Sequence, residues 1–136
     1  GITDLRKMGL RDKTVEFEPY DQMDQMIQSL IDETNPSLII SFYPKFAVHP
    51  DHEATAEAVV RTVGRMHVSD RPRLTLVAFS NDAPEILGEP DIQNDISQYS
   101  DIKLKAFEAH ASSPEIDGQA QSFLKIEPFW TYHFES

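Results

Sequence analysis

Apolar residues in the first half of the chain recur at the spacing of an α-helix. One stripe of positions i, i+3, i+4, i+7 and i+8 consists of Met23, Met26, Ile27, Leu30 and Ile31. This pattern predicts an amphipathic helix that Asp21 caps after Pro19-Tyr20 and that Asn35-Pro36 ends. A second helix is predicted from His52 to about Met66, with an inner stripe of Ala58, Val59, Thr62, Val63 and Met66.

Two continuous apolar runs lie among these helices. Leu38 to Tyr43 and Leu74 to Phe79 are rich in β-branched and aromatic residues, and turn residues bound the first of them. Each predicts a strand that is buried on both faces, as in a parallel sheet. Asp91 to Ser97 predicts a third, short strand, and residues 81–89 before it predict a loop.

The last third of the chain gives weaker signals. Ser100 is placed to cap a third helix that runs through His110, with Ile102, Ala106 and Phe107 along one side. The segment Phe129 to Phe134 is aromatic and extended. We interpret it as a strand that covers the core, with a subunit interface as the alternative, because aromatic residues are enriched at interfaces.

The alternation of helices and strands predicts an α/β fold with a mostly parallel sheet, in one domain that spans residues 1–136. In such sheets, ligands bind beyond the carboxyl ends of the strands. The loop from Pro44 to Pro50 leaves the carboxyl end of the first predicted strand, so this loop is the first place to look for a site.

Composition narrows the function. The net charge is −11, from 12 basic and 23 acidic residues, and a surface of this sign repels nucleic acid and anionic membranes. No apolar run is long enough to span a bilayer, and a cytoplasmic location fits. The chain has no cysteine, so any metal site must use His, Asp or Glu.

The residues with the most distinctive chemistry are His49-Pro50-Asp51-His52, in the predicted loop and at the start of the next helix. Neutral imidazole is a common zinc ligand, and a catalytic zinc uses three protein ligands and leaves a position for water. Asp51 fits two roles equally well: it could orient one of the histidines, or it could only cap the helix. Two histidines and one aspartate do not complete a zinc site.

These residues resemble a known family. Ser41 to Pro44 followed by His49 to Ala54 is similar to a signature of the LmbE-like (PIG-L) N-deacetylases. The stretches Asp95 to Tyr99 and Ile102 to Ser112 are similar to a further family segment. Within the family, the resemblance points to the deacetylases of bacillithiol biosynthesis.

The resemblance implies a Rossmann-like, three-layer α/β sandwich and a zinc ion that hydrolyses an N-acetyl group. It implies that His52 binds zinc, while a charged His49 stabilises the oxyanion and Asp51 pairs with His49. It also suggests substrate-binding roles for Asp12 and His110. The expected substrate is an N-acetylglucosaminyl conjugate such as GlcNAc-malate, and family members are often homo-oligomers.

One family signature is missing from this sequence. The chain has no His-Pro-Asp-Asp-Glu motif, which supplies two zinc ligands and the general base in the family. We therefore expect the chain to be the C-terminal part of the domain, with the remaining zinc ligands in an absent N-terminal segment and with no activity on its own. Two alternatives are an amidase acting on thiol-sugar S-conjugates and a non-catalytic, oligomerising fragment.

Overall fold

The structure is a computed structural model that describes residues 2–109 and 123–135. Short 3-10 turns lie at Val15–Phe17, Val68–Asp70 and Ser97–Tyr99. The helices are α1 (Tyr20–Thr34), α2 (Pro50–Arg65), α3 (Ala83–Leu87) and α4 (Ser100–Glu108), and the strands are β1 (Leu38–Phe42), β2 (Arg73–Val77), β3 (Ile92–Asp95) and β4 (Ile126–Thr131).

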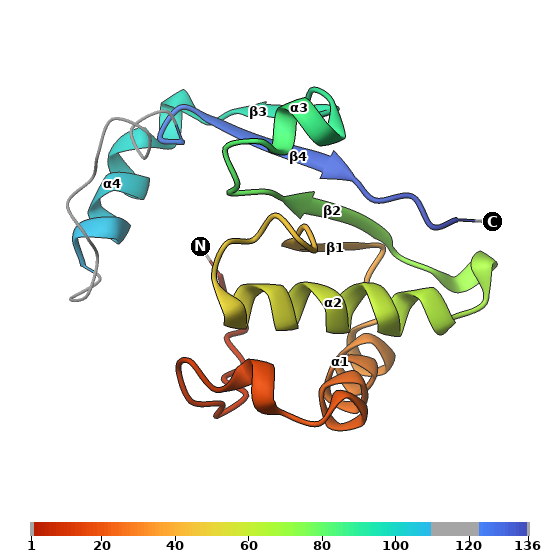
Figure 1. Ribbon diagram of the computed structural model, residues 1–136. Helices are drawn as coiled ribbons and strands as arrows, with labels where there is room; N and C mark the ends of the chain where they lie inside the picture. The colour runs from red at the N-terminus through yellow and green to blue at the C-terminus, as the bar shows by residue number, and fades with distance from the viewer. Residues whose placement is uncertain (1, 110–122, 136) are drawn as a thin grey trace.

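The strands form an open sheet in the order β1-β2-β4-β3 (Figure 1). β1 and β2 pair in parallel, whereas β4 is antiparallel to both β2 and β3. Three of the four described strands therefore point the same way, and β4 runs against them. This arrangement confirms the α/β class and agrees with a partial Rossmann-like fold.

Helices α1 and α2 lie on the same side of the sheet (Figure 1), and the main core forms there. Ile31 of α1 meets Val59 and Val63 of α2 over Leu74 and Leu76 of β2. The inner stripe predicted for α2 is confirmed, because four of its five positions are buried and Met66 packs against this core. Asn35 ends α1 in the left-handed conformation, with its N–H bonded to the Ile31 carbonyl at 2.8 Å.

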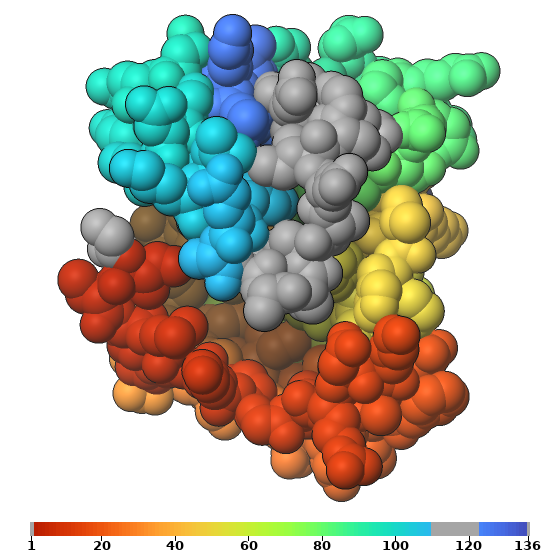
Figure 2. Space-filling model, turned by 90° about the vertical axis from the view of Figure 1, so that its left-hand side faces the viewer, coloured from red at the N-terminus to blue at the C-terminus, as the bar shows by residue number. Residues whose placement is uncertain are grey.

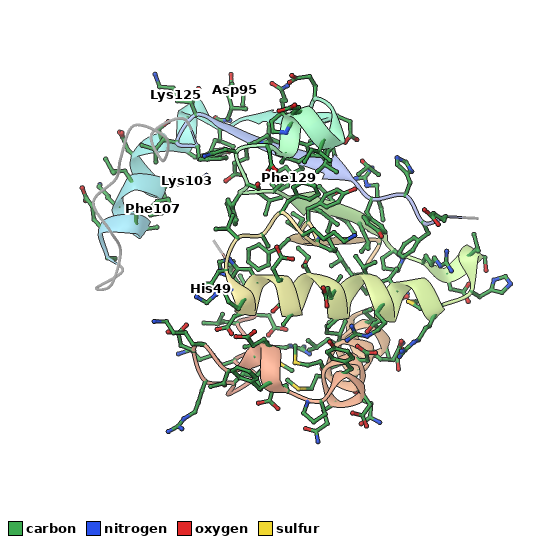
Figure 3. The ribbon with its side chains drawn as sticks, in the orientation of Figure 1. His49, Asp95, Lys103, Phe107, Lys125 and Phe129 are labelled. Atoms are coloured by element: carbon green, nitrogen blue, oxygen red, sulfur yellow. The ribbon has the colours of Figure 1, made fainter. Side chains whose placement is uncertain are left out.

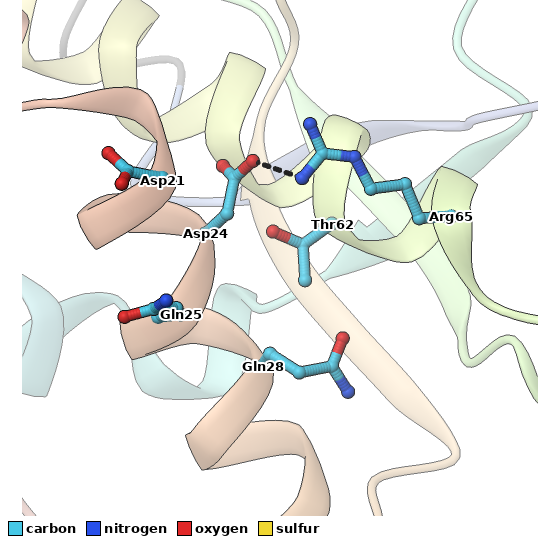
Figure 4. Close-up of a pocket in the computed structure, with 6 residues that line it drawn as sticks. All are labelled: Asp21, Asp24, Gln25, Gln28, Thr62 and Arg65. Carbon is cyan, nitrogen blue, oxygen red and sulfur yellow. Dashed lines mark hydrogen bonds and ion pairs between the residues drawn. The ribbon is translucent and has the colours of Figure 1, made fainter.

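An ion cluster joins α1 to α2. Asp24 is only 6% exposed, and its carboxylate accepts hydrogen bonds from Arg61 and Arg65 at 2.6–3.0 Å. Figure 4 shows Asp24 and Arg65 at a small polar pocket that Asp21, Gln25, Gln28 and Thr62 also line. The Arg61 hydrogen bond lowers the pKa of Asp24, which keeps this carboxylate charged despite its burial.

Several predicted features are wrong. Pro19, not Asp21, is the N-cap of α1. Strand β1 is not buried on both faces: in the described structure it is an edge strand, and Ile40 is 61% exposed. Only its other face, with Ile39, packs against the core under α2. Buried parallel strands and one-sided edge strands can share the same apolar run, so the sequence pattern did not separate them.

The region after β2 also differs from expectation. Residues 81–89 contain the short helix α3 rather than only a loop. Helix α4 has no buried residue among those described, and Ile102 on its apolar side is 68% exposed. Ser100 is the first residue of α4 rather than its cap, and its hydroxyl donates to the carbonyls of Ser97 and Leu124. Figure 2 shows α4 (cyan) on the same face of the molecule as the N-terminal residues (red).

The aromatic segment at the end of the chain belongs to the core, as first interpreted. Phe129 and Trp130 of β4 are 8% and 7% exposed, and Tyr132 and Phe134 pack against the main core cluster. Across the described residues, no helix combines the length and the apolar character that a membrane span requires.

Candidate active site

The His-Pro-Asp-His motif forms the N-terminus of α2, next to the carboxyl end of β1. His49 is the N-cap in an extended conformation, and Pro50 is the first helical residue, a position that suits its fixed φ and missing N–H. Figure 3 shows His49 at this end of the helix. The helix thus begins two residues earlier than predicted. The interpretation of Asp51 as the N-cap is wrong, because His49 holds that position.

The His49 ring is fixed by a backbone contact. Its Nδ1 accepts a hydrogen bond from the Asp51 N–H at 3.2 Å. A ring nitrogen that accepts carries no proton, so in this geometry Nε2 carries the proton of the neutral ring. Nε2 can then donate to a group in front of the helix. A ring that is protonated on both nitrogens could not accept this backbone N–H of Asp51.

The His52 ring lies between the ends of β1 and β2. It stacks on Phe42 with the ring centroids 4.2 Å apart and the planes 11° from parallel, and its centroid is 6.2 Å from that of Phe79. Its Nδ1 is buried and has no hydrogen-bond partner among the described residues. A buried nitrogen in this state is unfavourable unless another group binds it. His49 is close by, at 5.0 Å between ring centroids.

Asp51 has a contact that the sequence did not reveal. Its two carboxylate oxygens accept hydrogen bonds from the backbone N–H groups of Lys13 at 2.6 Å and Val15 at 3.1 Å. Asp51 thereby attaches the N-terminal segment to the start of α2. Its side-chain pairing with a charged His49 stays a prediction.

The tethered segment also brings Asp12 to the site. Asp12, His49 and Asp51 each offer a ligand atom, and these three atoms lie within 4.8 Å of one another. Asp12 is exposed and sits in a turn before Lys13, whose φ of 61° is left-handed. The structure thus places Asp12 beside the motif, while His110, the other suggested substrate residue, lies outside the described residues.

Glu53 is a site-forming residue that the sequence reasoning missed. Its carboxylate accepts from the N–H groups of Lys45 at 2.6 Å and Ala47 at 2.7 Å, so it shapes the loop that carries His49. An acidic residue in the first turn of a helix was the available signal. In the same loop, Val48 has a φ of 70°, which is strained for a β-branched residue.

The comparisons with known proteins cover nearly the whole chain. Residues 1–63 match the PIG-L family, described as GlcNAc-PI de-N-acetylase. A Bacillus cereus protein named probable N-acetyl-alpha-D-glucosaminyl L-malate deacetylase 2 is 44% identical over 99% of this chain, which covers 67% of that protein.

Relatives from two other Bacillus species have the same name. The Bacillus anthracis protein is 44% identical, and this chain covers 65% of its length. The Bacillus subtilis protein is 46% identical, with 66% of its length covered. The chain thus spans about two thirds of the length of these relatives. The motif lies at the N-terminus of α2, and the three relatives are 44–46% identical over nearly the whole chain. The chain therefore belongs to the PIG-L family of de-N-acetylases.

Proposed function

We propose that the whole protein hydrolyses the N-acetyl group of an N-acetylglucosaminyl conjugate of the GlcNAc-malate type, with zinc as its cofactor. The relatives that support the substrate are the Bacillus proteins named for this reaction. The structural observation that carries the proposal is the buried Nδ1 of His52, which has no hydrogen-bond partner among the residues that the structure describes, near the carboxyl ends of β1 and β2. A cytoplasmic location and a homo-oligomer remain predictions alongside it.

The residues at this position fit a zinc ion. Imidazole nitrogen is a favoured zinc ligand, and Nδ1 of His52, which has no hydrogen-bond partner among the described residues, is available for coordination. Stacking on Phe42 fixes the plane of the His52 ring, which lowers the entropy cost of binding. We assign His52 to the metal and propose that sequence outside this chain supplies the other ligands. Bound zinc supplies Lewis acidity, which polarises a carbonyl and lowers the pKa of water toward about 7.

His49 has the geometry of an oxyanion donor. Because Nδ1 accepts the Asp51 N–H, the Nε2–H group can donate a hydrogen bond to the acetyl oxygen as negative charge develops there. The positive end of the α2 dipole lies at the same place and favours the same charge. Hydrolysis then adds water to the acetyl carbon and breaks the C–N bond, which releases acetate and the free amine.

Asp51 and Asp12 have supporting roles in this proposal. Asp51 holds residues 13–15 against α2 through two backbone hydrogen bonds, and this contact keeps Asp12 within reach of His49. We propose that Asp12 takes part in substrate binding beside His49 at this end of α2. The base that removes the proton from water is expected from the missing family signature and is not assigned to this chain.

A kinetic comparison of histidine variants tests the proposal. Acetate release from GlcNAc-malate by the whole protein should fall about 10²–10³-fold in kcat in His49→Ala, the usual effect of losing one oxyanion donor. His133→Ala is the control, because this histidine is exposed and lies outside the site. Turnover of His49→Ala at the wild-type rate, or no acetate release by the wild type, would contradict the proposed function.

A further inference from the structure

A second pocket lies beyond the carboxyl end of β2. Its volume is about 340 Å³, within the range of roughly 300–1,000 Å³ for small-ligand sites. Its walls come from the segment after β2, from α3 to β3, and from β4 with Phe123 before it; α3, β3 and β4 lie together on one side of the molecule (Figure 1). Three aromatic side chains and three prolines form most of the lining: Phe79, Phe123, Trp130, Pro84, Pro90 and Pro128.

The polar groups of this pocket define the chemistry of its ligand. Glu89 and Gln93 line the pocket and are exposed, and the hydroxyl of Ser80, another lining residue, donates to Asp82. Among the lining residues that the structure describes, no lysine, arginine or histidine is present. Among these described lining residues, an anion would therefore meet a carboxylate and no cation. A neutral ligand with an apolar face and several hydroxyls suits this wall.

A pyranose ring has these two properties. Its axial C–H bonds form an apolar face that packs on aromatic rings, and its equatorial hydroxyls pair with carboxylate and amide side chains. The indole N–H of Trp130 is bonded to the Gly88 carbonyl at 2.9 Å, which fixes this ring in the wall. The pocket thus combines aromatic side chains with hydrogen-bonding side chains in its lining.

Phe79 connects this pocket to the candidate active site. Its ring centroid is 6.2 Å from that of His52 and 6.4 Å from that of Phe123, which lines the pocket. We propose that the pocket binds the neutral N-acetylhexosamine ring of the amide substrate and that the acidic aglycone points away from Glu89. This assignment rests on the proposed function, because it takes the sugar from the proposed substrate.

The single tryptophan of the chain provides a direct test. Free N-acetylglucosamine, titrated into the protein, should change Trp130 fluorescence in a saturable way. Phe123→Ala should weaken the binding about tenfold and Gln93→Ala about fivefold, as expected for one stacking contact and one hydrogen bond. Because Gln93 is exposed, its variant keeps the test valid if Phe123→Ala does not fold. Glu85→Ala on α3, outside the pocket lining, is the matched control and should bind like the wild type.

Further results separate this inference from the proposed function. His52→Ala should lose acetate release and keep N-acetylglucosamine binding. No fluorescence response in a protein that does release acetate, or equal weakening by Glu85→Ala and Gln93→Ala, would overturn the pocket assignment alone. Saturable binding with the expected variant pattern, in a whole protein that releases no acetate, would support the sugar pocket and overturn the proposed reaction.

Discussion

The buried carboxylate of Asp24 allows a quantitative test of how α1 is held against α2. Asp24→Asn keeps the shape of the side chain and removes the charge that Arg61 and Arg65 share. Breaking a buried ion pair on one side costs about 3–5 kcal/mol. Arg65 is two-thirds exposed and can be solvated again. We therefore expect Asp24→Asn to lower the free energy of unfolding by about 3 kcal/mol, the lower end of this range.

Urea unfolding at neutral pH measures this loss. With a slope of about 2 kcal/mol per molar urea, the unfolding midpoint should fall by roughly 1.5 M. Asp21→Asn is the matched control on the same helix, since Asp21 is exposed and contributes at most about 1 kcal/mol through the helix dipole.

The pH dependence has a defined sign. The pKa of Asp24 is lower in the folded protein than in the unfolded chain, mainly because of the Arg61 hydrogen bond. Its stabilisation is therefore complete well above the unfolded value of about 3.9 and is lost as the pH falls toward the folded pKa. The difference in the free energy of unfolding between wild type and Asp24→Asn should therefore shrink as the pH falls toward the folded pKa of Asp24. Equal unfolding midpoints for Asp24→Asn and Asp21→Asn at neutral pH would refute the claim that the Asp24 ion cluster stabilises the packing of α1 on α2.

Three further predictions concern single residues. Asp51→Ala should release the N-terminal segment and cost roughly 2–3 kcal/mol, because two backbone N–H groups lose a charged acceptor; faster amide exchange at residues 13 and 15 measures it. Val48→Asn should stabilise the protein by about 1 kcal/mol in thermal unfolding, since Asn tolerates a φ of 70°, whereas Val68→Asn, at a similarly exposed residue without positive φ, should not. Leu76→Ala should cost about 2–5 kcal/mol in urea unfolding, because Leu76 is fully buried in the main core.

Much of the fold followed from local patterns in the sequence. The stripes of α1 and α2 were readable because a helix repeats its buried face every 3.6 residues, and Asn35 ends α1 as its sequence suggested. The exposure of Ile40 was not readable, since it depends on which strand lies beside β1. Helix α3 was missed because five residues are too few to show a periodic pattern.

The candidate site was predictable in its position and not in its contacts. The order of strand, loop and helix placed His49 and His52 at the carboxyl end of β1, where the structure has them. The partners of Asp51 lie 36 and 38 residues earlier in the chain, and only the folded backbone brings them together. The N-cap role of His49 was also hidden, because histidine is not among the residues that commonly occupy this position.

Zinc binding by paired variants of the whole protein tests the central assignment most directly. Titration calorimetry with zinc should show that His52→Ala loses the metal, while His49→Ala and Asp12→Asn keep it at wild-type stoichiometry. If His49→Ala or Asp12→Asn loses zinc while His52→Ala keeps it, the metal instead belongs to the group of Asp12, His49 and Asp51, and the role assigned to His52 is wrong.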